Sequence, residues 1–382
     1  MPMEQIAYPC TVMRGGTSRA LFFHEKDLPP KGPERDYLLM KAMGKPGRLE
    51  IDGLGGGQLG TSKIAIIGPP SISDADIDYT FAQVLIESDD IEYRANCGNI
   101  SAAVAPFAID AGLIKAVSPE TVVRIHNTNT QKILTARVPV KEGHVRVKGN
   151  YVMQGIPGTG SEIVIDFSKT LGAKTGKLLP TGKVIDEIYL EGGTQLEVSI
   201  CDAGNPGVFV RASDLGLNGT ELPPEIDNNI QVLDQASEIK NKVAEKIGLT
   251  DNWRTADPKL TNPAVAIVGE TTDYVTPDGV QVAASDADLL ARLIILNSCH
   301  PSYAGTGAVC TAACASIPGT IPHQLIKHTN NIVRIAHPRG VMPVKAILSQ
   351  SRTGSTYDFD FLGVSRTARK IMDGQVFIPI PD

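Results

Sequence analysis

Two short segments of the chain are apolar on every side and rich in small residues, and one lies in each half. They are residues 100–109, ISAAVAPFAI, and residues 308–316, AVCTAACAS. A helix without a polar face is stable in water only where other elements surround it, so each segment predicts a buried central helix. A glycine turn precedes each one, CGN at residues 97–99 and GTG at residues 305–307. The chain is therefore expected to fold as two similar halves.

Strand patterns surround both central helices. Each such segment alternates apolar and polar residues, or runs through β-branched residues, between Gly, Pro and Asn. The clearest are HVRVKGNYVMQG (144–155), SEIVIDF (161–167), TQLEVSI (194–200) and PGVFVRA (206–212). Strands around buried helices make the expected fold class α+β. Two such halves facing each other would bring both helix N-termini to one cleft.

A third helix is expected over residues 230–247, IQVLDQASEIKNKVAEKI. The segment is amphipathic, so this helix should lie on the surface. Its apolar residues at near-helical spacing are Ile230, Leu233, Ile239, Val243 and Ile247.

The length of 382 residues is too great for one ordinary core and predicts two domains. Residues 169–183, KTLGAKTGKLLPTGK, are rich in Gly and Lys without periodicity and are the best candidate for the crossover. The expected domains are therefore 1–183 and 184–382, with a return of the C-terminal ~20 residues to the first domain left open.

Composition excludes several classes of protein. Hydrophobic residues make up 42% of the chain and charged residues 20%, which is typical of a globular protein. A net charge of −6 spread along the chain argues against nucleic acid or an anionic membrane as a partner. No apolar stretch approaches the ~20 residues of a membrane span. The segment MPMEQIAYPC lacks the basic and apolar regions of a signal peptide.

The cysteines and histidines show no metal-binding or disulfide pattern. Six cysteines are spread along the chain without a CxxC pair, and they are expected to be reduced thiols of a cytoplasmic protein. Seven histidines include no HxxxH or HExxH pattern, so no dedicated metal site is expected.

Residues 53–63, GLGGGQLGTSK, carry five glycines in eight positions and raise the question of a phosphate-binding loop. Such a loop needs Lys directly after its last Gly and Ser or Thr after the Lys, whereas here Thr61 and Ser62 precede Lys63. Nucleotide binding is therefore not expected. A glycine turn with a surface lysine remains open, but KIAIIG reads as a buried strand. Lys63, at its start, is expected at a rim or pocket rather than in free solvent.

The stretch ANCGNISAAVAPF places Cys97 at the start of the first central helix. Backbone N–H groups and the positive end of the helix dipole converge there and favour a thiolate. Cys97 is thus a candidate nucleophile or acid/base group, and the N–H groups of Gly98 and Asn99 could bind a carboxylate or a developing enolate. A small buried hydrophobe is the alternative for Cys97, and that is the expectation for the other cysteines: Cys10, Cys201, Cys299, Cys310 and Cys314.

Several motifs together resemble the PrpF family. They occur in the family's order over nearly the whole chain: MRGGTS (13–18), IDGLGG (51–56), TSK (61–63), CGN (97–99), HNTN (126–129), DAGNP (202–206) and YAGTGAVC (303–310). The family contains 2-methylaconitate cis-trans isomerase, 4-oxalomesaconate tautomerase and 3-methylitaconate Δ-isomerase.

This resemblance implies a diaminopimelate-epimerase-like fold: two pseudo-symmetric domains, each a mixed sheet rolled around a central helix, with the site between them. It also implies cofactor-independent chemistry on a small unsaturated polycarboxylate, with Lys63 and Cys97 flanking the substrate. Diaminopimelate epimerases and proline racemases carry a second cysteine before the turn of the second half, where this chain has Ala304. It therefore lacks the two-thiol racemase apparatus, whereas one cysteine, one lysine and a carboxylate-binding cleft can suffice for an allylic proton shift.

Further residues are candidates for substrate binding. In MRGGTS, Thr17 and Ser18 are expected to present donors to a carboxylate, while Arg14 is as well explained as a solvated charge. His300 is equally well explained as a structural histidine, and Asn205 as part of an Asn-Pro turn; Asn127 and Asn129 can simply shape a turn. The full set expected to bind substrate is Thr17, Ser18, Gln58, Ser62, Gly98, Asn99, Asn205, His300, Ser302, Gly305, Thr306 and Gly307.

The sequence thus predicts a cytoplasmic, cofactor-independent isomerase that shifts a C=C bond, acting as a homo-oligomer. The substrate favoured is 3-methylitaconate, converted to 2,3-dimethylmaleate, because GGGQLGTSK and CHPSYAGTG differ from the methylaconitate branch. 2-Methylaconitate and 4-oxalomesaconate are the alternatives. A hydro-lyase acting on a similar acid, and an accessory protein that binds a polycarboxylate or a partner dehydratase, are the rivals from other classes.

Overall fold

The computed structural model describes residues 4–94, 96–326, 331–349 and 357–380. The chain divides into two compact units. Unit 1 comprises Met1–Met153, Gly158–Ile165 and Arg366–Asp382, and unit 2 comprises Gln154–Pro157 and Asp166–Ser365. The division therefore falls before residues 169–183 rather than after them, and the C-terminal segment belongs to unit 1.

Hydrogen bonds explain why residues 169–183 belong to unit 2. Gly172 donates its N–H to the carbonyl of Asp202, and Asp202 donates its own N–H to the carbonyl of Leu178. The carboxylate of Asp202 accepts N–H bonds from Lys174 and Thr175 at 2.8 Å. This glycine-rich segment is thus anchored along its length to a strand of unit 2.

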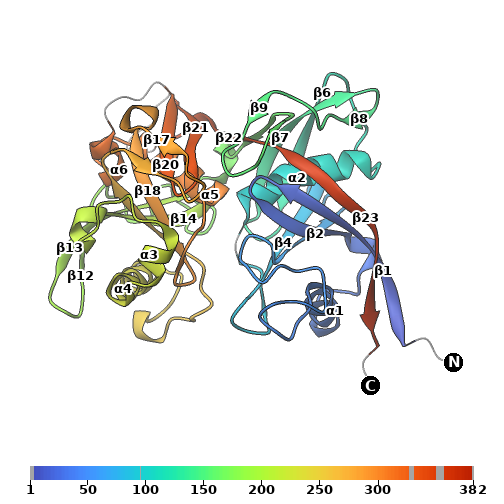
Figure 1. The fold of residues 1–382 in the computed structure, drawn as a ribbon, viewed down its shortest axis with the longest axis horizontal. Coiled ribbons are helices and arrows are strands. Elements are labelled where there is room, and N and C mark those ends of the chain that lie inside the picture. Colours follow the sequence, from blue (N-terminus) through green and yellow to red (C-terminus); the bar gives the residue numbers. More distant parts are fainter. Residues whose placement is uncertain (1–3, 95, 327–330, 350–356, 381–382) are drawn as a thin grey trace. The chain divides into compact units, whose positions relative to one another are not determined.

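The sheet of unit 1 has the strand order β23–β1–β2–β3–β4–β6–β7 (Figure 1). Its strands are β1 (Gln5–Gly15), β2 (Ser18–His24), β3 (Lys63–Gly68), β4 (Ile77–Val84), β6 (Glu120–Asn127), β7 (Lys132–Lys141) and β23 (Ala368–Pro379). Successive pairs are antiparallel, antiparallel, parallel, antiparallel, parallel and antiparallel.

The sheet of unit 2 repeats this pattern in the order β12–β13–β14–β15–β18–β20–β21, with β22 paired to β21. Its strands are β12 (Asp186–Tyr189), β13 (Gln195–Ala203), β14 (Asn205–Arg211), β15 (Ala264–Gly269), β18 (Leu289–Ile295), β20 (Ile332–His337), β21 (Gly340–Leu348) and β22 (Phe359–Arg366). The directions of the first six pairs match those of unit 1 one by one. The two halves are therefore pseudo-symmetric, as the sequence predicted.

Each sheet curls around one buried helix. In unit 1, α2 (Gly98–Asp110) contacts strands from β23 at one edge to β7 near the other, and Figure 1 draws it among those strands. In unit 2, α5 (Gly305–Ala315) contacts β13, β14, β15, β20 and β21. Nearly every residue of both helices is buried. The predicted central helices are confirmed.

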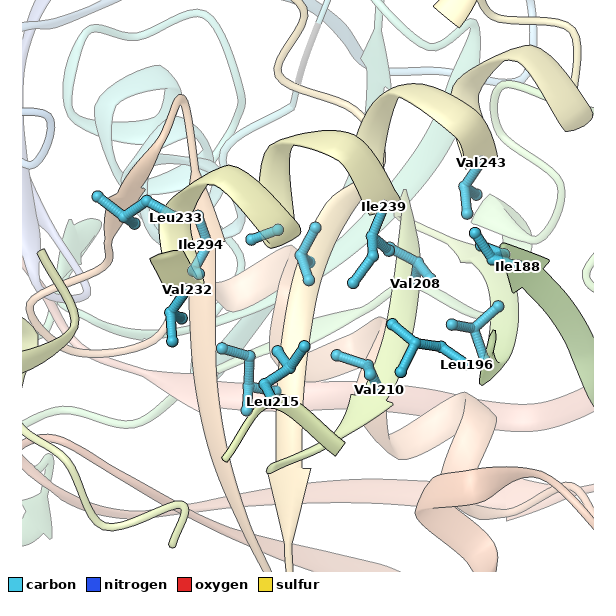
Figure 2. Packing of buried hydrophobic residues seen from close by; sticks show 14 of the residues in the cluster. Ile188, Leu196, Val208, Val210, Leu215, Val232, Leu233, Ile239, Val243 and Ile294 are labelled. Carbon is cyan, nitrogen blue, oxygen red and sulfur yellow. The ribbon is translucent and has the colours of Figure 1, made fainter. Parts of the chain in front are cut away.

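A second layer covers the outer face of each sheet. In unit 1, α1 (Pro33–Met43) packs Leu39 and Met43 against a cluster that includes Leu21 and Ile64. In unit 2, α4 (Ile230–Lys246) packs against β13, β14 and β15, and Figure 2 shows Leu233, Ile239 and Val243 pointing into this cluster.

Ile230, which the sequence grouped with the apolar residues of this helix, does not lie on its buried face. Ile230 is 72% exposed, because it is the first residue of the helix and precedes the turn that meets the sheet. Val232 and Ala236 are buried on the inner face instead.

Among the described helices, none is long and apolar enough to cross a membrane.

Shorter elements complete the two units. They are α3 (Pro223–Asp227), α6 (Ile321–Leu325), β5 (Ile91–Glu92), β8 (His144–Val145), β9 (Tyr151–Val152), β10 (Thr159–Gly160), β11 (Ile163–Asp166), β16 (Tyr274–Val275), β17 (Gln281–Val282) and β19 (Ser298–Cys299). Residues 144–155, expected as one strand, form only β8 and β9. Between them, the backbone at Gly149 lies too close to Gly160 and Ser161 to admit a side chain.

Candidate active site

Lys63 is the first residue of β3, where the sequence predicted it, and its side chain is 8% exposed. Ile64 and Ile66 point to the α1 side of the sheet, so alternation turns Lys63 toward the α2 side. Its Nζ donates a hydrogen bond to Oε1 of Gln83 at 2.5 Å and lies 5.3 Å from the ring centroid of Phe81. Burial lowers the pKa of Lys63, while the nearby Cys97 thiol acts in the opposite direction.

The glycine loop before Lys63 already binds an anion of its own chain. Oε2 of the buried Glu50 accepts N–H bonds from Gly56 and Gly57 at 2.8 Å and an O–H bond from Ser62 at 2.6 Å. A Cβ at Gly55 would lie 2.0 Å from this oxygen, which is why the loop needs glycine there. Ser62, expected to bind substrate, is fully buried and gives its hydroxyl to Glu50.

Cys97 is the N-cap residue of α2, as predicted. Its carbonyl accepts bonds from the N–H of Ser101 at 2.8 Å and from the Ser101 hydroxyl at 2.9 Å. The preceding residue, Asn96, accepts further bonds from Ser101 and from Asn127, both at 3.2 Å. The backbone around the thiol is therefore held from two sides, and Asn127 of the HNTN motif contributes to that support.

Cys97 differs from the other cysteines in exposure. All six are described and free, and five are buried while Cys97 is partly exposed. Burial raises the pKa of Cys10 and of Cys299 to about 12. The other five cysteines are buried, as expected for small hydrophobic residues of the core. Cys97 is the thiol that a reagent or substrate can reach.

A chain of polar contacts covers the N-terminus of α2. Asn99 accepts a bond from Nε of Arg366 at 3.1 Å and donates from Nδ2 to the Thr17 hydroxyl at 3.1 Å. The hairpin turn between β1 and β2 packs directly on this amide, since a Cβ at Gly16 would lie 2.2 Å from Asn99 Oδ1. Arg366 is 2% exposed, and burial lowers its pKa to about 10.

Unit 2 has a corresponding contact at the start of α5. Asn205 follows the hairpin glycine Gly204 and donates from Nδ2 to the Thr306 hydroxyl at 3.2 Å. This pair corresponds to Thr17 and Asn99 of unit 1, with the two residue types exchanged. The N-cap residue of α5 is Ala304.

The remaining sequence candidates occupy varied positions. Nδ1 of His300, a buried residue, accepts the N–H of Ser302 at 3.1 Å, and the Ser302 hydroxyl lies 3.5 Å from Nδ1 of His337. Gln58 is exposed. Ser18 is buried at the start of β2. Gly98 belongs to the first turn of α2, and Gly305, Thr306 and Gly307 to that of α5.

Arg14 and Asn129, for which the sequence also allowed a structural explanation, have structural roles. Arg14 donates to the carbonyls of Gly16 and Thr367 at 2.9 and 2.8 Å, so it holds the hairpin turn against the chain that returns through β23. Asn129 bonds both backbone groups of Phe81 at 2.8 Å.

Sequence reasoning missed three residues around this site. Gln83 contacts Lys63, and Arg366 contacts Asn99. Tyr79 is fully buried, and its pKa is raised by that burial and then by the nearby Cys97 thiolate. No short motif marks any of them. Alternation along QV at the end of β4 could have placed Gln83 on the inner face, but its partner depends on strand register.

The chain matches the family model described as PrpF protein over residues 5–379. It is 43% identical over 379 residues to 3-methylitaconate isomerase of Eubacterium barkeri, covering 98% of each chain. The chain belongs to the PrpF family. Its relatives also include 2-methyl-aconitate isomerase of Cupriavidus necator, at 36% identity over 99% of this chain and 98% of that one. A 4-oxalomesaconate tautomerase of Pseudomonas putida is 34% identical over 98% and 97%.

Solved structures agree with this assignment. The crystal structure of a methylitaconate-delta-isomerase superposes with a TM-score of 0.82 at 43% identity, covering 99% of this chain and 97% of that one. A hydroxyproline epimerase from Agrobacterium vitis gives a TM-score of 0.58 at 13% identity, over 99% and 93%, which shows the shared fold. The PrpF protein described here is therefore an isomerase with an epimerase-like α+β fold.

Proposed function

We propose that this PrpF protein shifts a C=C bond in a small unsaturated di- or tricarboxylate by moving an allylic proton, and that Lys63 and Cys97 carry the proton. The observation that supports this most is their placement. A buried lysine without a carboxylate partner among the described residues interacts with a partly exposed thiol at the start of α2. An allylic shift removes a proton from one carbon and delivers a proton to another, and Lys63 and Cys97 together can perform both steps.

The substrate we propose is 3-methylitaconate, which would become 2,3-dimethylmaleate. The identity of 43% to a named 3-methylitaconate isomerase over almost the whole chain supports this choice over 2-methylaconitate and 4-oxalomesaconate. A base removes the proton from the carbon that carries the methyl group and a carboxylate. The electron pair moves through the C=C bond, and a proton is delivered to the terminal methylene carbon, which becomes a methyl group.

The negative charge that develops on the substrate carboxylate needs donors. The first-turn N–H groups of α2, at Gly98 and Asn99, have no partner within the helix and suit this role. We propose that Thr17, Asn99 and Arg366 form the anion-binding edge around them, since they are joined by hydrogen bonds. Asn205, His300, Ser302, Thr306 and the glycines around Thr306 remain proposed binding residues of unit 2.

The direct test is to incubate the purified protein with 3-methylitaconate in D₂O and follow the products by NMR and mass spectrometry. Isomerisation in H₂O leaves the mass unchanged, and in D₂O it labels the new methyl group. Loss of water from the substrate would indicate a hydro-lyase instead. Binding without any exchange would indicate an accessory protein, and faster turnover of 2-methylaconitate or 4-oxalomesaconate would move the substrate assignment.

The proposal also retains the expectations that the enzyme needs no cofactor, works in the cytoplasm and assembles as a homo-oligomer. Activity after exhaustive dialysis against a chelator tests the first. Light scattering of the full chain tests the last.

A further inference from the structure

Gln83 stands directly opposite Lys63 in the antiparallel pair β3–β4. Both side chains are buried, with Lys63 8% and Gln83 5% exposed, and they meet through the bond from Nζ to Oε1 at 2.5 Å. This is a cross-strand pair held between two strands that are themselves buried almost throughout. The lysine head group is therefore positioned by the strand register and by a single amide oxygen.

The orientation of the Gln83 amide is fixed by its own bonds. Nε2 donates to the carbonyl of Ser62 at 2.9 Å and to the carbonyl of Val84 at 3.1 Å. Both N–H groups of the amide are thus used. A flipped amide would direct its oxygen at two carbonyls and its NH₂ group at the ammonium, so Oε1 can only face Lys63.

The neutrality of the Gln83 amide is as important for Lys63 as the position of that amide. An amide oxygen accepts a hydrogen bond from either an amine or an ammonium and carries no net charge, whereas a carboxylate would hold the lysine protonated. No ion pair joins Lys63 to a carboxylate of the described residues, and Phe81 supplies an apolar wall beside Nζ. The buried carboxylate on the neighbouring strand is Glu92, which stands opposite Gln83 in the pair β4–β5 and is ion-paired with Arg94. The titratable group that acts on Lys63 is Cys97, which in turn interacts with Tyr79 and Arg366.

We propose that Gln83 is a positioning residue that holds Lys63 by a neutral acceptor, so that the lysine reaches the substrate as a free amine and acts as the proton-abstracting base. This inference rests on the proposed function, because it assigns to Lys63 one of the two proton-transfer roles left open there. It also explains why a buried amide, rather than the more common carboxylate, faces a buried lysine.

Two variants with opposite expected effects test the inference. Gln83→Glu places a negative charge at Nζ and should move the acidic limb of the kcat/KM profile upward by on the order of 1–3 pH units. Gln83→Met removes the acceptor, and the same limb should move downward, with kcat falling more than KM changes. A merely structural role would not give shifts of opposite sign. Gln375→Glu, an exposed change of the same charge on β23, should leave the profile unchanged.

A second measurement reports on Lys63 without catalysis. The rate at which acetic anhydride modifies Lys63, measured by peptide mass spectrometry across pH, follows the fraction of free amine. We expect its midpoint to rise in Gln83→Glu and to fall in Gln83→Met. If either variant fails to fold, the other still decides by the sign of its shift.

Together the two measurements distinguish the positioning role of Gln83 from the role of Lys63 as the base. Unshifted profiles and unshifted labelling in a folded variant would overturn the role of Gln83, even if Lys63→Met remained inactive. Shifted labelling with an unshifted rate profile would support the contact but contradict Lys63 as the base, and that would count against the proposed function as well.

Discussion

Cys97 and Ala304 occupy equivalent positions in the two units, each as the N-cap residue of the central helix. Each helix also receives a hairpin turn through one hydrogen bond, between Asn99 and Thr17 in unit 1 and between Asn205 and Thr306 in unit 2. The two halves therefore share a scaffold but differ in the one atom that a two-thiol racemase requires. Of the two N-cap positions, this chain carries a cysteine at one.

The first prediction follows from that difference. A racemase needs an acid and a base on opposite faces of one carbon, and Ala304 supplies neither. We expect no racemisation of proline or diaminopimelate, measured by polarimetry with a proline racemase as positive control. Racemisation at a rate comparable to that control would show that another residue replaces the missing thiol.

The second prediction concerns Cys97. Replacing the thiol in Cys97→Ser should reduce kcat by at least ~10²-fold, the usual scale for a positioned acid/base group. In the parent enzyme, iodoacetamide should modify Cys97 first and abolish activity, because the five other cysteines are buried. Those five serve as internal controls in the same digest. Inactivation that tracks modification of another cysteine would remove Cys97 from the mechanism.

The third prediction concerns Lys63. Lys63→Met keeps the length of the stem but removes charge and base, so kcat should fall by ~10²-fold or more while the fold is retained. A lysine that only anchors substrate would instead give a KM that rises more than kcat falls.

The pH dependence of the parent enzyme has a definite sign if Lys63 is the base. Burial lowers the pKa of Lys63, so kcat/KM should rise with pH and level off above a midpoint below that of an ordinary lysine. Between the folded and unfolded pKa values, the unfolded chain binds more protons at this lysine, so its contribution to the free energy of unfolding increases with pH there. Lys63→Met should lose that slope in chemical unfolding, and activity that falls with pH through this interval would indicate an anchoring ammonium.

Local sequence patterns predicted where Lys63 and Cys97 lie in the fold. KIAIIG marked a buried strand and therefore placed Lys63 out of solvent, and the apolar run after CGN placed Cys97 at a helix start. Both inferences use only the continuous apolar character of the residues that follow. The repeated pattern of the halves was visible for the same reason, because each small-residue helix follows its own glycine turn.

The partners of those residues could not be predicted, because they depend on register and on long-range return of the chain. Gln83 meets Lys63 only when β3 and β4 pair in one register. Arg366 reaches Asn99 across 267 positions, at the point where the chain leaves β22 for β23. The contact between the Glu50 carboxylate and the glycine loop could not be predicted either, because the N–H groups of such a loop can bind a carboxylate of the same chain as well as an anionic ligand.

The fourth prediction uses a matched pair of glycines. Gly16 has φ +52° and a Cβ there would strike Asn99, whereas Gly112 has φ +73° with nothing within 4 Å. Gly112→Ala should cost only about 1 kcal/mol of backbone strain. Gly16→Ala should destabilise more and should raise KM, because it displaces the amide that joins Thr17 and Arg366. Equal unfolding free energies and an unchanged KM for the two variants would contradict this reading.

The last prediction concerns the glycine loop, whose N–H groups at Gly56 and Gly57 are occupied by Glu50. A phosphate would have to displace a buried carboxylate that also accepts the Ser62 hydroxyl. ATP should therefore give no thermal shift, although a ligand at 100 times its Kd would stabilise the fold by about 2.7 kcal/mol.

Glu50 itself should matter for both stability and activity. Glu50→Ala removes the acceptor of the Gly56 and Gly57 N–H groups and leaves the buried Ser62 hydroxyl unpaired, which by itself costs about 1–3 kcal/mol. Glu50→Gln keeps one acceptor oxygen and should cost less. Because Ser62 immediately precedes Lys63, release of the loop should also displace the lysine and lower kcat on the order of 10²-fold in Glu50→Ala. Urea unfolding and steady-state kinetics on both variants test this. A Glu50→Ala enzyme with parental kcat would show that β3 positions Lys63 without the loop, and ATP binding by that same variant would show that the carboxylate had excluded it.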